Sequence, residues 1–341
     1  MNRYFSTFIT GFDSAIGDAL KRTLKGVKID LLLDGLVVYS TNKSIEDIKR
    51  LGFLNNSFLL LKLFEKRPNQ DINAMMRQVI NNSNLPLSKA TLPKKFKTFR
   101  VIASKENQFI SVDRFLLNKI ESKIRFLTGL RTNRSLPDVE FWFLARSEGY
   151  GFFGMRLTRH QDLAKSLQKG ELRPEFANIL NLLSEPSKGD VFLDPFTGSG
   201  AIPIERSKQF SFARIIAGDN DLTVIKKLKE RIKGKNMRLD VSRLDALRLS
   251  DLENLSVDKI VTDPPWGHFS NIDLNLKDFY GQMLDSFYRV LKNNGLAIVV
   301  VGDRELLEEV LNTLSHRFLL LDKYYTLVSG RKAGVYKIRK G

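Results

Sequence analysis

Residues 190–338 alternate short apolar segments with amphipathic segments in a regular order. The apolar segments predict strands over 190–194, 213–218, 237–241, 259–262 and 296–301, and the amphipathic segments predict helices over 201–209, 222–232, 279–291 and 305–314. Two more predicted strands, 318–327 and 334–338, suit an antiparallel pair that closes the series. Strands that alternate with helices favour a parallel, doubly wound sheet with helices on its faces. We therefore expect an α/β fold for this part of the chain.

An aspartate stands at or just beyond the end of each of the first four predicted strands. These residues are Asp194, Asp219, Asp245 and Asp263. In open α/β sheets a ligand lies outside the carboxyl ends of the strands, so side chains at successive strand ends line one crevice. A single aspartate at such a place can be merely a helix N-cap. Four of them in order indicate a binding site.

A glycine-rich turn follows the first of these strands, with the sequence Pro195-Phe196-Thr197-Gly198-Ser199-Gly200. Glycine lets a ligand come close to backbone N–H groups at the start of a helix. The turn is neither a P-loop, which needs a lysine after its last glycine, nor a G-x-G-x-x-G dinucleotide fingerprint. An acid after the second strand, here Asp219, is the usual acceptor for ribose hydroxyls in nucleotide-binding α/β folds.

The fourth predicted strand stops abruptly at Asp263-Pro264-Pro265-Trp266-Gly267. A proline cannot donate to a sheet ladder, and Pro265 pushes Pro264 into an extended conformation. The chain must therefore leave the sheet here with its carbonyls free and Trp266 just beyond the strand end. An acid, a free carbonyl and an aromatic plate can together hold a flat molecule that donates hydrogen bonds. The alternative is a tight turn capped by a core tryptophan.

The stretch from Asp194 to Ile202, followed by Asp263-Pro264-Pro265-Trp266-Gly267, resembles the class I S-adenosylmethionine-dependent methyltransferases that modify exocyclic amines of bases. Within that class the chain resembles the THUMP-containing RNA methyltransferases, including the tRNA guanine-N2 group. Leu157-Thr158 and Leu172-Arg173-Pro174 are similar to the linker of that family. The resemblance implies a Rossmann-like domain whose seven-stranded sheet is mostly parallel with an antiparallel C-terminal strand.

The part of the chain before this domain has an α+β pattern that becomes more basic after residue 64. Asp34-Gly35 is a strong hairpin signal, and Ser44 with Asp47 comes close to a helix capping box. Residues 92–102 interleave cations with aromatic residues, which suits contact with RNA. With the resemblance, we expect a ferredoxin-like α+β region over 1–64, a THUMP-like RNA-binding domain over 65–149, and the linker and methyltransferase domain over 150–341. A structural domain with ordinary surface lysines is the alternative for 65–149.

The resemblance also implies roles for single residues. The residues expected to bind S-adenosyl-L-methionine are Asp194, Phe196, Thr197, Gly198, Ser199, Gly200, Asp219, Asn220, Asp245 and Ala246. Asp194 and the turn would hold the methionine part, Asp219 would accept the ribose hydroxyls (with Asp221 as a substitute), and Asp245 would meet the adenine amine. The residues expected to be catalytic are Asp263, Pro264, Pro265 and Trp266. Many relatives have a basic residue shortly after the loop glycine, where this chain has His268-Phe269, to which we assign no catalytic role.

The chemistry of such a loop follows from its parts. An exocyclic amine is a poor nucleophile because its lone pair is delocalised into the ring. The Asp263 carboxylate and the Pro264 carbonyl can accept its hydrogens, orient it toward the methyl group and stabilise developing positive charge. Trp266 can stack on a base flipped into the pocket, an interaction of about 1–3 kcal/mol per base. No metal is needed.

The loop does not distinguish the target base. Guanine offers adjacent N1–H and N2–H donors, and the adenine amine also supplies two hydrogens. The family layout favours guanine N2 in RNA, with tRNA as the expected partner. The alternatives are guanine N2 in rRNA, adenine N6 in RNA or DNA, and a non-catalytic RNA-binding protein that retains the fold, against which the intact Asp263-Pro264-Pro265-Trp266 loop argues.

Composition agrees with an RNA partner and excludes several other classes. The chain has 55 Lys and Arg against 38 Asp and Glu, a net charge of +17, and such an excess points to a polyanion. It has no cysteine, which excludes disulfides, thiol catalysis and iron–sulfur clusters, and its three histidines, His160, His268 and His316, are too scattered for a metal site. We find no apolar run of the ~18 residues that span a bilayer and no signal peptide, so we expect a cytoplasmic protein without membrane contact.

Overall fold

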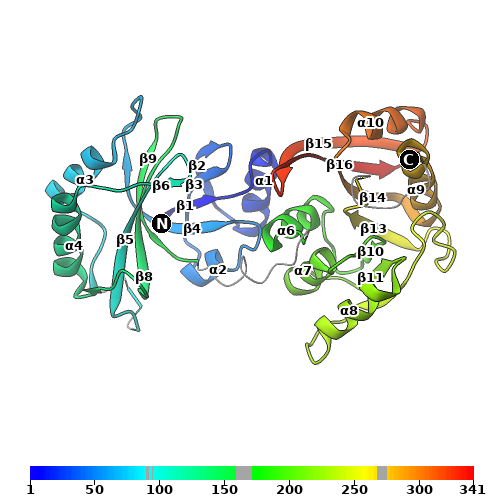
Figure 1. The fold of residues 1–341 in the computed structure, drawn as a ribbon, viewed down its shortest axis with the longest axis horizontal. Helices are drawn as coiled ribbons and strands as arrows, with labels where there is room; N and C mark the ends of the chain where they lie inside the picture. The colour runs from blue at the N-terminus through cyan, green and yellow to red at the C-terminus, as the bar shows by residue number, and fades with distance from the viewer. Residues whose placement is uncertain (90–91, 94, 159–170, 267–274) are drawn as a thin grey trace. The chain divides into compact units, whose positions relative to one another are not determined.

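The computed structural model describes residues 1–89, 92–93, 95–158, 171–266 and 275–341 (Figure 1). The chain divides into two compact units. The N-terminal unit comprises residues 1–7, 20–51 and 56–160, and the C-terminal unit comprises residues 8–19, 52–55 and 161–341. None of the described helices combines the length and the apolar character that a membrane span requires.

The N-terminal unit is built on a nine-stranded sheet with the order β2-β3-β1-β4-β9-β8-β5-β6, in which β7 also pairs with β5. Its strands are β1 (Asn2–Thr7), β2 (Lys28–Leu33), β3 (Leu36–Thr41), β4 (Asn56–Phe64), β5 (Thr98–Lys105), β6 (Gln108–Phe109), β7 (Arg131–Thr132), β8 (Val139–Ala145) and β9 (Gly151–Arg156). Because β4 pairs with β9, one sheet runs through both predicted N-terminal parts. The assignment of these parts as ferredoxin-like and THUMP-like remains a prediction.

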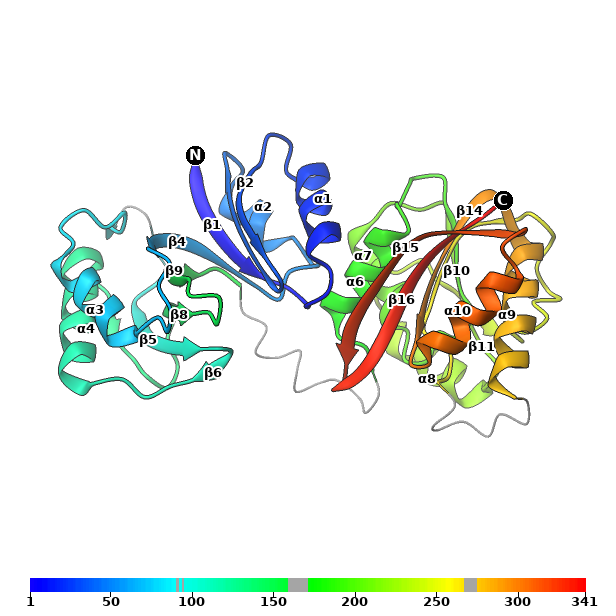
Figure 2. The same cartoon turned by 90° about the horizontal axis from the view of Figure 1, so that it is seen from above.

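Helices cover this sheet where the sequence carries apolar stripes. α3 (Ile72–Asn81) and α4 (Arg114–Thr128) share one apolar cluster with β5, β8 and β9. Figures 1 and 2 show these two helices side by side. The short helix α2 (Ile45–Lys49) begins at Ser44, whose side chain accepts from the Asp47 N–H while the Asp47 carboxylate accepts from the Ser44 N–H. These two reciprocal hydrogen bonds form a capping box, which the sequence had indicated at Ser44 and Asp47.

The C-terminal unit contains a seven-stranded sheet with the order β12-β11-β10-β13-β14-β16-β15. Its strands are β10 (Val191–Asp194), β11 (Arg214–Asp219), β12 (Asp240–Arg243), β13 (Val257–Thr262), β14 (Leu291–Val301), β15 (Phe318–Val328) and β16 (Arg331–Lys340). The first five strands are parallel to one another, and β16 is antiparallel to both of its neighbours. The predicted sheet type, mostly parallel with an antiparallel C-terminal strand, is confirmed.

Helices cover both faces of this sheet (Figure 2). On one face α9 (Leu276–Val290) and α10 (Arg304–Thr313) bury an extensive apolar core with the central strands. On the other face α7 (Ala201–Gln209) and α8 (Leu222–Ile232) pack on β11, and α6 (Pro174–Leu183) packs on α7. Two-sided coverage explains why the inner strands read as apolar runs.

The N-terminal segment 8–19 also belongs to this unit. The Phe12 ring lies 5.2 Å from the Tyr324 ring and 6.0 Å from the Phe176 ring, measured between centroids. From segment 52–55, the Gly52 carbonyl accepts a 3.3 Å hydrogen bond from Asn178. The sequence offered no sign of these contacts, because each joins residues more than a hundred positions apart.

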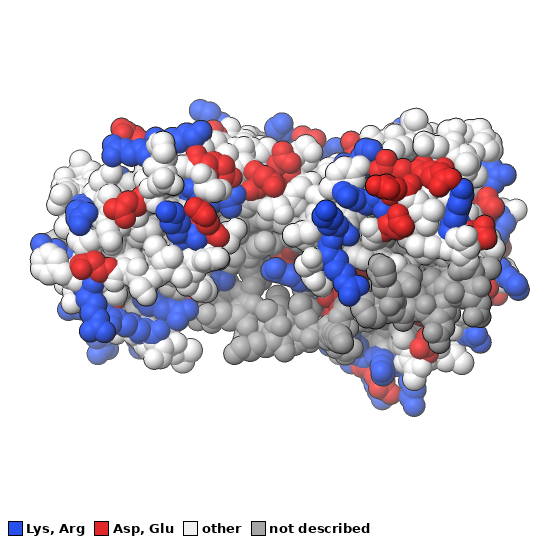
Figure 3. Space-filling view, turned by 45° about the horizontal axis from the view of Figure 1, so that its top comes forward, with Lys and Arg blue, Asp and Glu red and all other residues white. Residues whose placement is uncertain are grey.

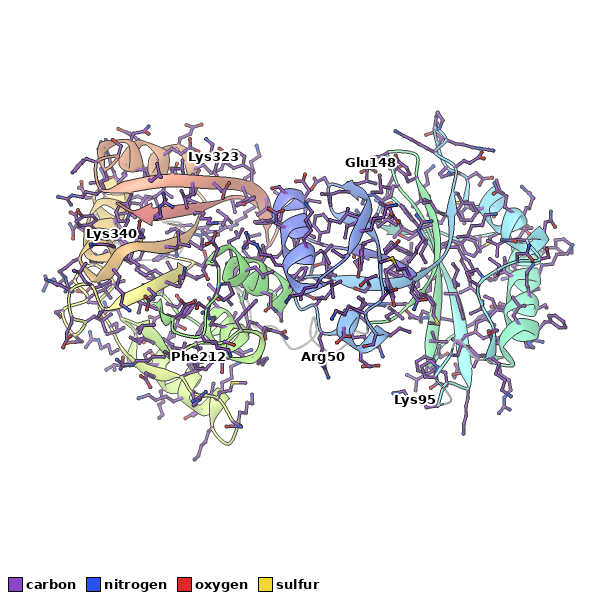
Figure 4. The ribbon with its side chains drawn as sticks, turned by 180° about the vertical axis from the view of Figure 1, so that it is seen from behind. Arg50, Lys95, Glu148, Phe212, Lys323 and Lys340 are labelled. Atoms are coloured by element: carbon purple, nitrogen blue, oxygen red, sulfur yellow. The ribbon has the colours of Figure 1, made fainter. Side chains whose placement is uncertain are left out.

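Lys340, at the end of β16, is buried against the last turn of α9 (Figure 4). Its Nζ donates hydrogen bonds of 2.6 Å to the Tyr288 carbonyl and 2.8 Å to the Leu291 carbonyl. Carbonyls at a helix C-terminus lack partners within the helix, and a cation there is favourable. Burial lowers the pKa of Lys340. This cap fastens the closing strand pair to the helix.

A buried ion pair anchors the start of β10 to α7. Arg206 is fully buried and donates a 2.6 Å hydrogen bond to Asp190, which also accepts from the Ser187 N–H at 2.7 Å. The Arg206 guanidinium lies 5.1 Å from the centroid of the Phe192 ring. Removing one partner of such a pair strands a charge in a medium that solvates it poorly.

We predict that Asp190→Ala lowers the free energy of unfolding by about 3–5 kcal/mol, because Arg206 loses its counter-ion inside the protein. Urea denaturation measures this. Asp240→Ala is the matched control, because its pair with Arg214 is exposed on both sides and should contribute less than about 1 kcal/mol. Equal losses in the two variants would contradict the assignment of the buried pair.

Candidate active site

The order of the parallel strands reverses between β10 and β13. From β10 the chain proceeds outward to β11 and β12, whereas β13 and β14 lie on its other side. At such a switch point the loops after the two strands diverge and leave a crevice. Asp194 ends β10 and Asp263 follows β13, so the two carboxyl groups meet at this point. Thr262 joins the two strand ends, because its hydroxyl donates a 2.8 Å hydrogen bond to Asp194 Oδ1.

Asp194 is a buried carboxyl group with one oxygen left open. Its side chain is 1% exposed, and Oδ1 accepts from the Thr262 hydroxyl and from the Phe196 N–H at 3.3 Å. Oδ2 is buried and has no hydrogen-bond partner among the described residues. Burial raises the pKa of Asp194 to about 8, and the nearby carboxyl groups of Asp263 and Asp219 contribute in the same direction. A cationic or hydrogen-donating ligand group would satisfy the open oxygen.

The glycine-rich turn has two glycines with a left-handed backbone conformation. Gly198 and Gly200 have φ of 51° and 85°, which glycine adopts readily. A Cβ on Gly200 would lie 2.4 Å from Leu228 Cδ1, so α8 also requires a glycine there. Thr197 N–H donates to the Gly218 carbonyl at 2.8 Å, while its buried hydroxyl has no partner among the described residues.

Asp219 binds this turn from the end of β11. One of its carboxylate oxygens accepts from the Gly198 N–H at 3.1 Å, and the other accepts from the Asp221 N–H at 3.0 Å. Asp221 is the N-cap of α8, and its carboxylate accepts from the Thr223 N–H at 2.7 Å. The two acids therefore differ, because Asp221 is used by its own helix while Asp219 faces the turn.

The remaining predicted residues lie further along the strand order. Asn220 accepts a 3.1 Å hydrogen bond from Arg243. Asp245 follows β12 and accepts from the Leu247 N–H at 3.0 Å, and the carbonyl of buried Ala246 accepts from the Ser286 hydroxyl at 2.6 Å. Among the described residues no hydrogen bond links Asp245 to Asp194. The structure thus brings Asp194, Asp219 and the turn together and leaves Asp245 at the rim.

The loop after β13 folds its own tryptophan onto its acid. Trp266 Nε1–H donates a 2.9 Å hydrogen bond to Asp263 Oδ1. Loss of hydration raises the pKa of Asp263 to about 7, against the lowering effect of the Trp266 hydrogen bond. Pro264 follows Asp263 and is buried, whereas Pro265 and Trp266 are partly exposed. Gly267, His268 and Phe269 lie outside the described residues.

Three residues at this site escaped the sequence reasoning. Thr262 bonds Asp194, Gly302 accommodates the Trp266 ring, and Tyr280 has a buried hydroxyl without a partner among the described residues. Burial raises the pKa of Tyr280, and the nearby carboxyl groups of Asp303 and Asp263 add to this effect. The sequence gives only weak signals for Thr262 and Gly302, a small polar residue before an acid and a glycine at a strand end. Their roles depend on partners that lie far away in sequence. In the described part of the chain no group of three or more His, Cys, Asp or Glu side chains is arranged to hold a metal ion.

Comparison with known proteins identifies this unit. Residues 162–319 match the model of the RMKL-like methyltransferase domain (UPF0020). The match covers most of the C-terminal unit and includes β10, β13 and the loops that follow them. The predicted class I methyltransferase fold is therefore confirmed.

Two curated relatives are named as enzymes that methylate guanine in tRNA. The mouse tRNA (guanine(6)-N(2))-methyltransferase THUMP3 is 30% identical over 183 residues, which are 50% of this chain and 36% of the mouse protein. The chain thus matches about a third of the length of this relative. The tRNA (guanine(10)-N2)-dimethyltransferase of Methanocaldococcus jannaschii is 24% identical over 286 residues, which cover 76% of this chain and 79% of that protein. The second match extends beyond the methyltransferase domain into the N-terminal unit.

A solved structure matches the whole chain. TrmN from Thermus thermophilus superposes with a TM-score of 0.75 at 21% identity and covers 100% of both chains. At this identity the likeness concerns the fold. It agrees with a methyltransferase domain that follows a separate N-terminal sheet.

We predict that Asp194→Asn changes how the stability of the protein depends on pH. In the folded protein Asp194 keeps its proton up to about pH 8, whereas in the unfolded chain it releases the proton at about pH 3.9. Wild-type stability therefore falls as pH rises between these values, and the variant lacks this loss. Urea denaturation should show the variant gaining at least about 1 kcal/mol on the wild type from about pH 5 to about pH 8.

The control for this prediction is Asp221→Asn. Hydrogen bonds from Thr223 lower the pKa of this exposed acid from its ordinary value of 3.8, so its contribution to stability is lost only at lower pH. From about pH 5 to about pH 8 the stability of Asp221→Asn should therefore run parallel to that of the wild type. Parallel pH profiles for the wild type and Asp194→Asn would contradict the role of burial at Asp194.

Proposed function

We propose that this protein transfers a methyl group from S-adenosylmethionine to the exocyclic N2 amine of a guanosine in RNA, with tRNA as the substrate. The observation that carries the proposal is the Asp263-Pro264-Pro265-Trp266 loop at the switch point of a methyltransferase domain, next to the open carboxyl of Asp194. The choice of guanine N2 in tRNA rests on the names of the curated relatives. The proposal includes a cytoplasmic location for the protein, which is consistent with a tRNA substrate.

The polar groups at the glycine-rich turn suit S-adenosylmethionine. The buried Asp194 Oδ2 and Thr197 hydroxyl both lack partners among the described residues, and a ligand with cationic and hydrogen-donating groups would satisfy them. In the proposal Asp194, Gly198 and Gly200 hold the methionine part, Asp219 accepts the ribose hydroxyls and Asp245 accepts from the adenine amine. The bound cofactor supplies an electrophilic methyl group.

The loop residues act on the amine. Asp263 Oδ2 and the Pro264 carbonyl accept the two amine hydrogens, which directs the nitrogen lone pair toward the methyl group. The amine gains positive charge during transfer, and a neighbouring carboxylate stabilises that charge. A carboxyl group with a pKa of about 7 is suited to accept the surplus proton near neutral pH. Trp266 provides an apolar plate for the flipped base.

The N-terminal unit carries aromatic and basic side chains that suit an RNA strand. Phe109, Phe115 and Phe126 are 75%, 64% and 88% exposed, which is unusual for phenylalanine. Lys119 Nζ lies 4.3 Å from the centroid of the Phe115 ring. A cleft of about 930 Å³ in the same unit is lined by residues that include Phe109 and Arg114. Stacking on aromatic rings and ion pairing with phosphates are the usual means of binding single-stranded RNA.

On the face shown in Figure 3, Lys and Arg side chains are spread over the surface and lie among Asp and Glu side chains. The net charge of +17 is therefore not gathered in a single patch on this face. Recognition in the proposal depends on defined aromatic and basic positions as well as on general attraction to phosphate.

We predict that the protein transfers labelled methyl groups to unmodified total tRNA and that nucleoside analysis finds the label in N2-methylguanosine. Asp263→Ala should reduce transfer at least about 100-fold, because the amine loses its acceptor, while the affinity for S-adenosylmethionine measured by calorimetry stays close to wild type. Label in rRNA or in N6-methyladenosine with none in tRNA would overturn the substrate assignment. Full activity of Asp263→Ala would overturn the loop assignment.

We also predict that Arg114→Glu combined with Lys119→Glu weakens tRNA binding at least about tenfold and flattens its salt dependence, because two phosphate contacts are lost. Fluorescence anisotropy over a salt series measures both effects. Lys28→Glu reverses an exposed charge elsewhere on the same unit, on β2, and serves as the control. Equal effects of charge reversal at both places would show that only the general charge of the protein attracts RNA.

A further inference from the structure

The indole N–H of Trp266 donates a hydrogen bond to one oxygen of Asp263, the proposed catalytic carboxyl group. The indole Nε1 lies 2.9 Å from Asp263 Oδ1, and none of the described residues donates a hydrogen bond to Asp263 Oδ2. An indole can donate but cannot accept, so this contact holds the carboxyl in one orientation and favours its charged form. One oxygen of Asp263 is thus fixed by the loop, and the other remains for an incoming donor.

Gly302, which follows β14, provides the space for the ring. A Cβ on Gly302 would lie 2.7 Å from Cε3, 3.0 Å from Cδ2 and 3.3 Å from Cβ of Trp266. Gly302 does not have a positive φ, so alanine would fit the backbone there and would be disfavoured by contact with the indole alone. The ring is therefore held from two sides, by the Asp263 carboxyl and by the end of the neighbouring strand.

The other titratable groups near Asp263 do not replace this contact. They are Asp194 from β10 and Tyr280 from α9, and Tyr280 also lies near Asp303, which follows β14. The Tyr280 hydroxyl has no hydrogen-bond partner among the described residues, and the Asp194 carboxyl accepts from Thr262 and Phe196. In the described part of the chain, Trp266 is thus the one side chain that donates a hydrogen bond to Asp263.

We propose that Trp266 is a positioning residue for Asp263 as well as a plate for the base: its N–H, seated on Gly302, turns Asp263 Oδ2 toward the amine that is to be methylated. This inference rests on the proposed amine methylation. Phenylalanine or tyrosine at position 266 would stack on a base as well as tryptophan does, but neither would place an N–H donor at Asp263. The tryptophan therefore contributes an orientation that the aromatic plate alone lacks.

The first test is the pH profile of Trp266→Phe. Phenylalanine keeps the plate, so the KM for tRNA should change less than about threefold, while kcat should fall about tenfold because the carboxyl is free to rotate. The lost N–H no longer stabilises the carboxylate, so the acid limb of kcat at saturating S-adenosylmethionine should move up by about one pH unit. The pH dependence of cofactor affinity, which follows Asp194, should stay unchanged. An unmoved acid limb would overturn the inference.

The second test does not depend on activity. The chain has two tryptophans, Trp142 and Trp266, so a protein labelled with 15N at tryptophan gives two indole N–H signals. The Trp266 signal should shift with a midpoint near pH 7, and Asp263→Asn should abolish this shift while Asp194→Asn preserves it. Trp142 is the internal control, because it donates to Glu140, whose pKa is lowered by its hydrogen bonds with Arg156, Trp142 and Arg100.

Gly302→Ala completes the design. The added methyl group should displace the indole, remove the pH-dependent shift of its signal and lower kcat about as much as Trp266→Phe does. In the Trp266→Phe background the same change should cost little, because the hydrogen bond is already absent. Additive losses would contradict a shared role. A pH-dependent Trp266 signal without any methyl transfer to RNA would refute the proposed function and leave the contact intact, whereas active enzyme with an unshifted signal would refute the inference alone.

Discussion

The hydrogen bond from Thr262 to Asp194 connects the two strands between which the sheet order reverses. It is 2.8 Å long, fully buried, and lies where β10 and β13 end side by side. The loops on either side of it run in opposite directions and define the crevice. The bond engages Oδ1 of Asp194, while Oδ2 has no partner among the described residues. It therefore also determines which oxygen of Asp194 remains for a ligand. The geometry of the whole site depends on this pair.

The buried carboxyl groups of the site destabilise the folded protein, and contacts elsewhere in the domain stabilise it. Two carboxyl groups, Asp194 and Asp263, have pKa values raised to about 8 and about 7 by loss of hydration. Polar groups held away from water destabilise a protein unless ligands or partners satisfy them. Below the same strand, the start of β10 is anchored by Asp190 and Arg206, and the far end of α9 is capped by Lys340. Strong contacts thus lie at the amino ends of the strands, opposite the buried carboxyl groups at the carboxyl ends.

The sequence predicts periodic features well and long-range contacts poorly. The order of strands and helices, the strand-end acids and the glycine-rich turn could be read from 190–338, because each follows from local periodicity. The third strand was expected at 237–241, but only Asp240–Arg243 pairs with β11, and the preceding apolar residues pack as a loop. Residues 292–295 were expected to separate a helix from the strand over 296–301, yet they belong to β14 and form an irregularity in it, with Asn294 at φ 61°. The contacts of Trp266 with Asp263 and Gly302 needed coordinates, because they depend on which way one side chain turns.

The place of β16 in the sheet has a consequence for assembly of the methyltransferase domain. Although it follows every other described strand in sequence, β16 is an interior strand, with β14 on one side and β15 on the other. The edge strand β15 therefore cannot join the sheet until β16 is available to bridge the gap. During synthesis the central parallel strands can pair early, but their antiparallel border waits for residues 331–340 to leave the ribosome. Loss of these ten residues would remove the middle of the border and leave an open edge on β14, the kind of edge at which chains aggregate.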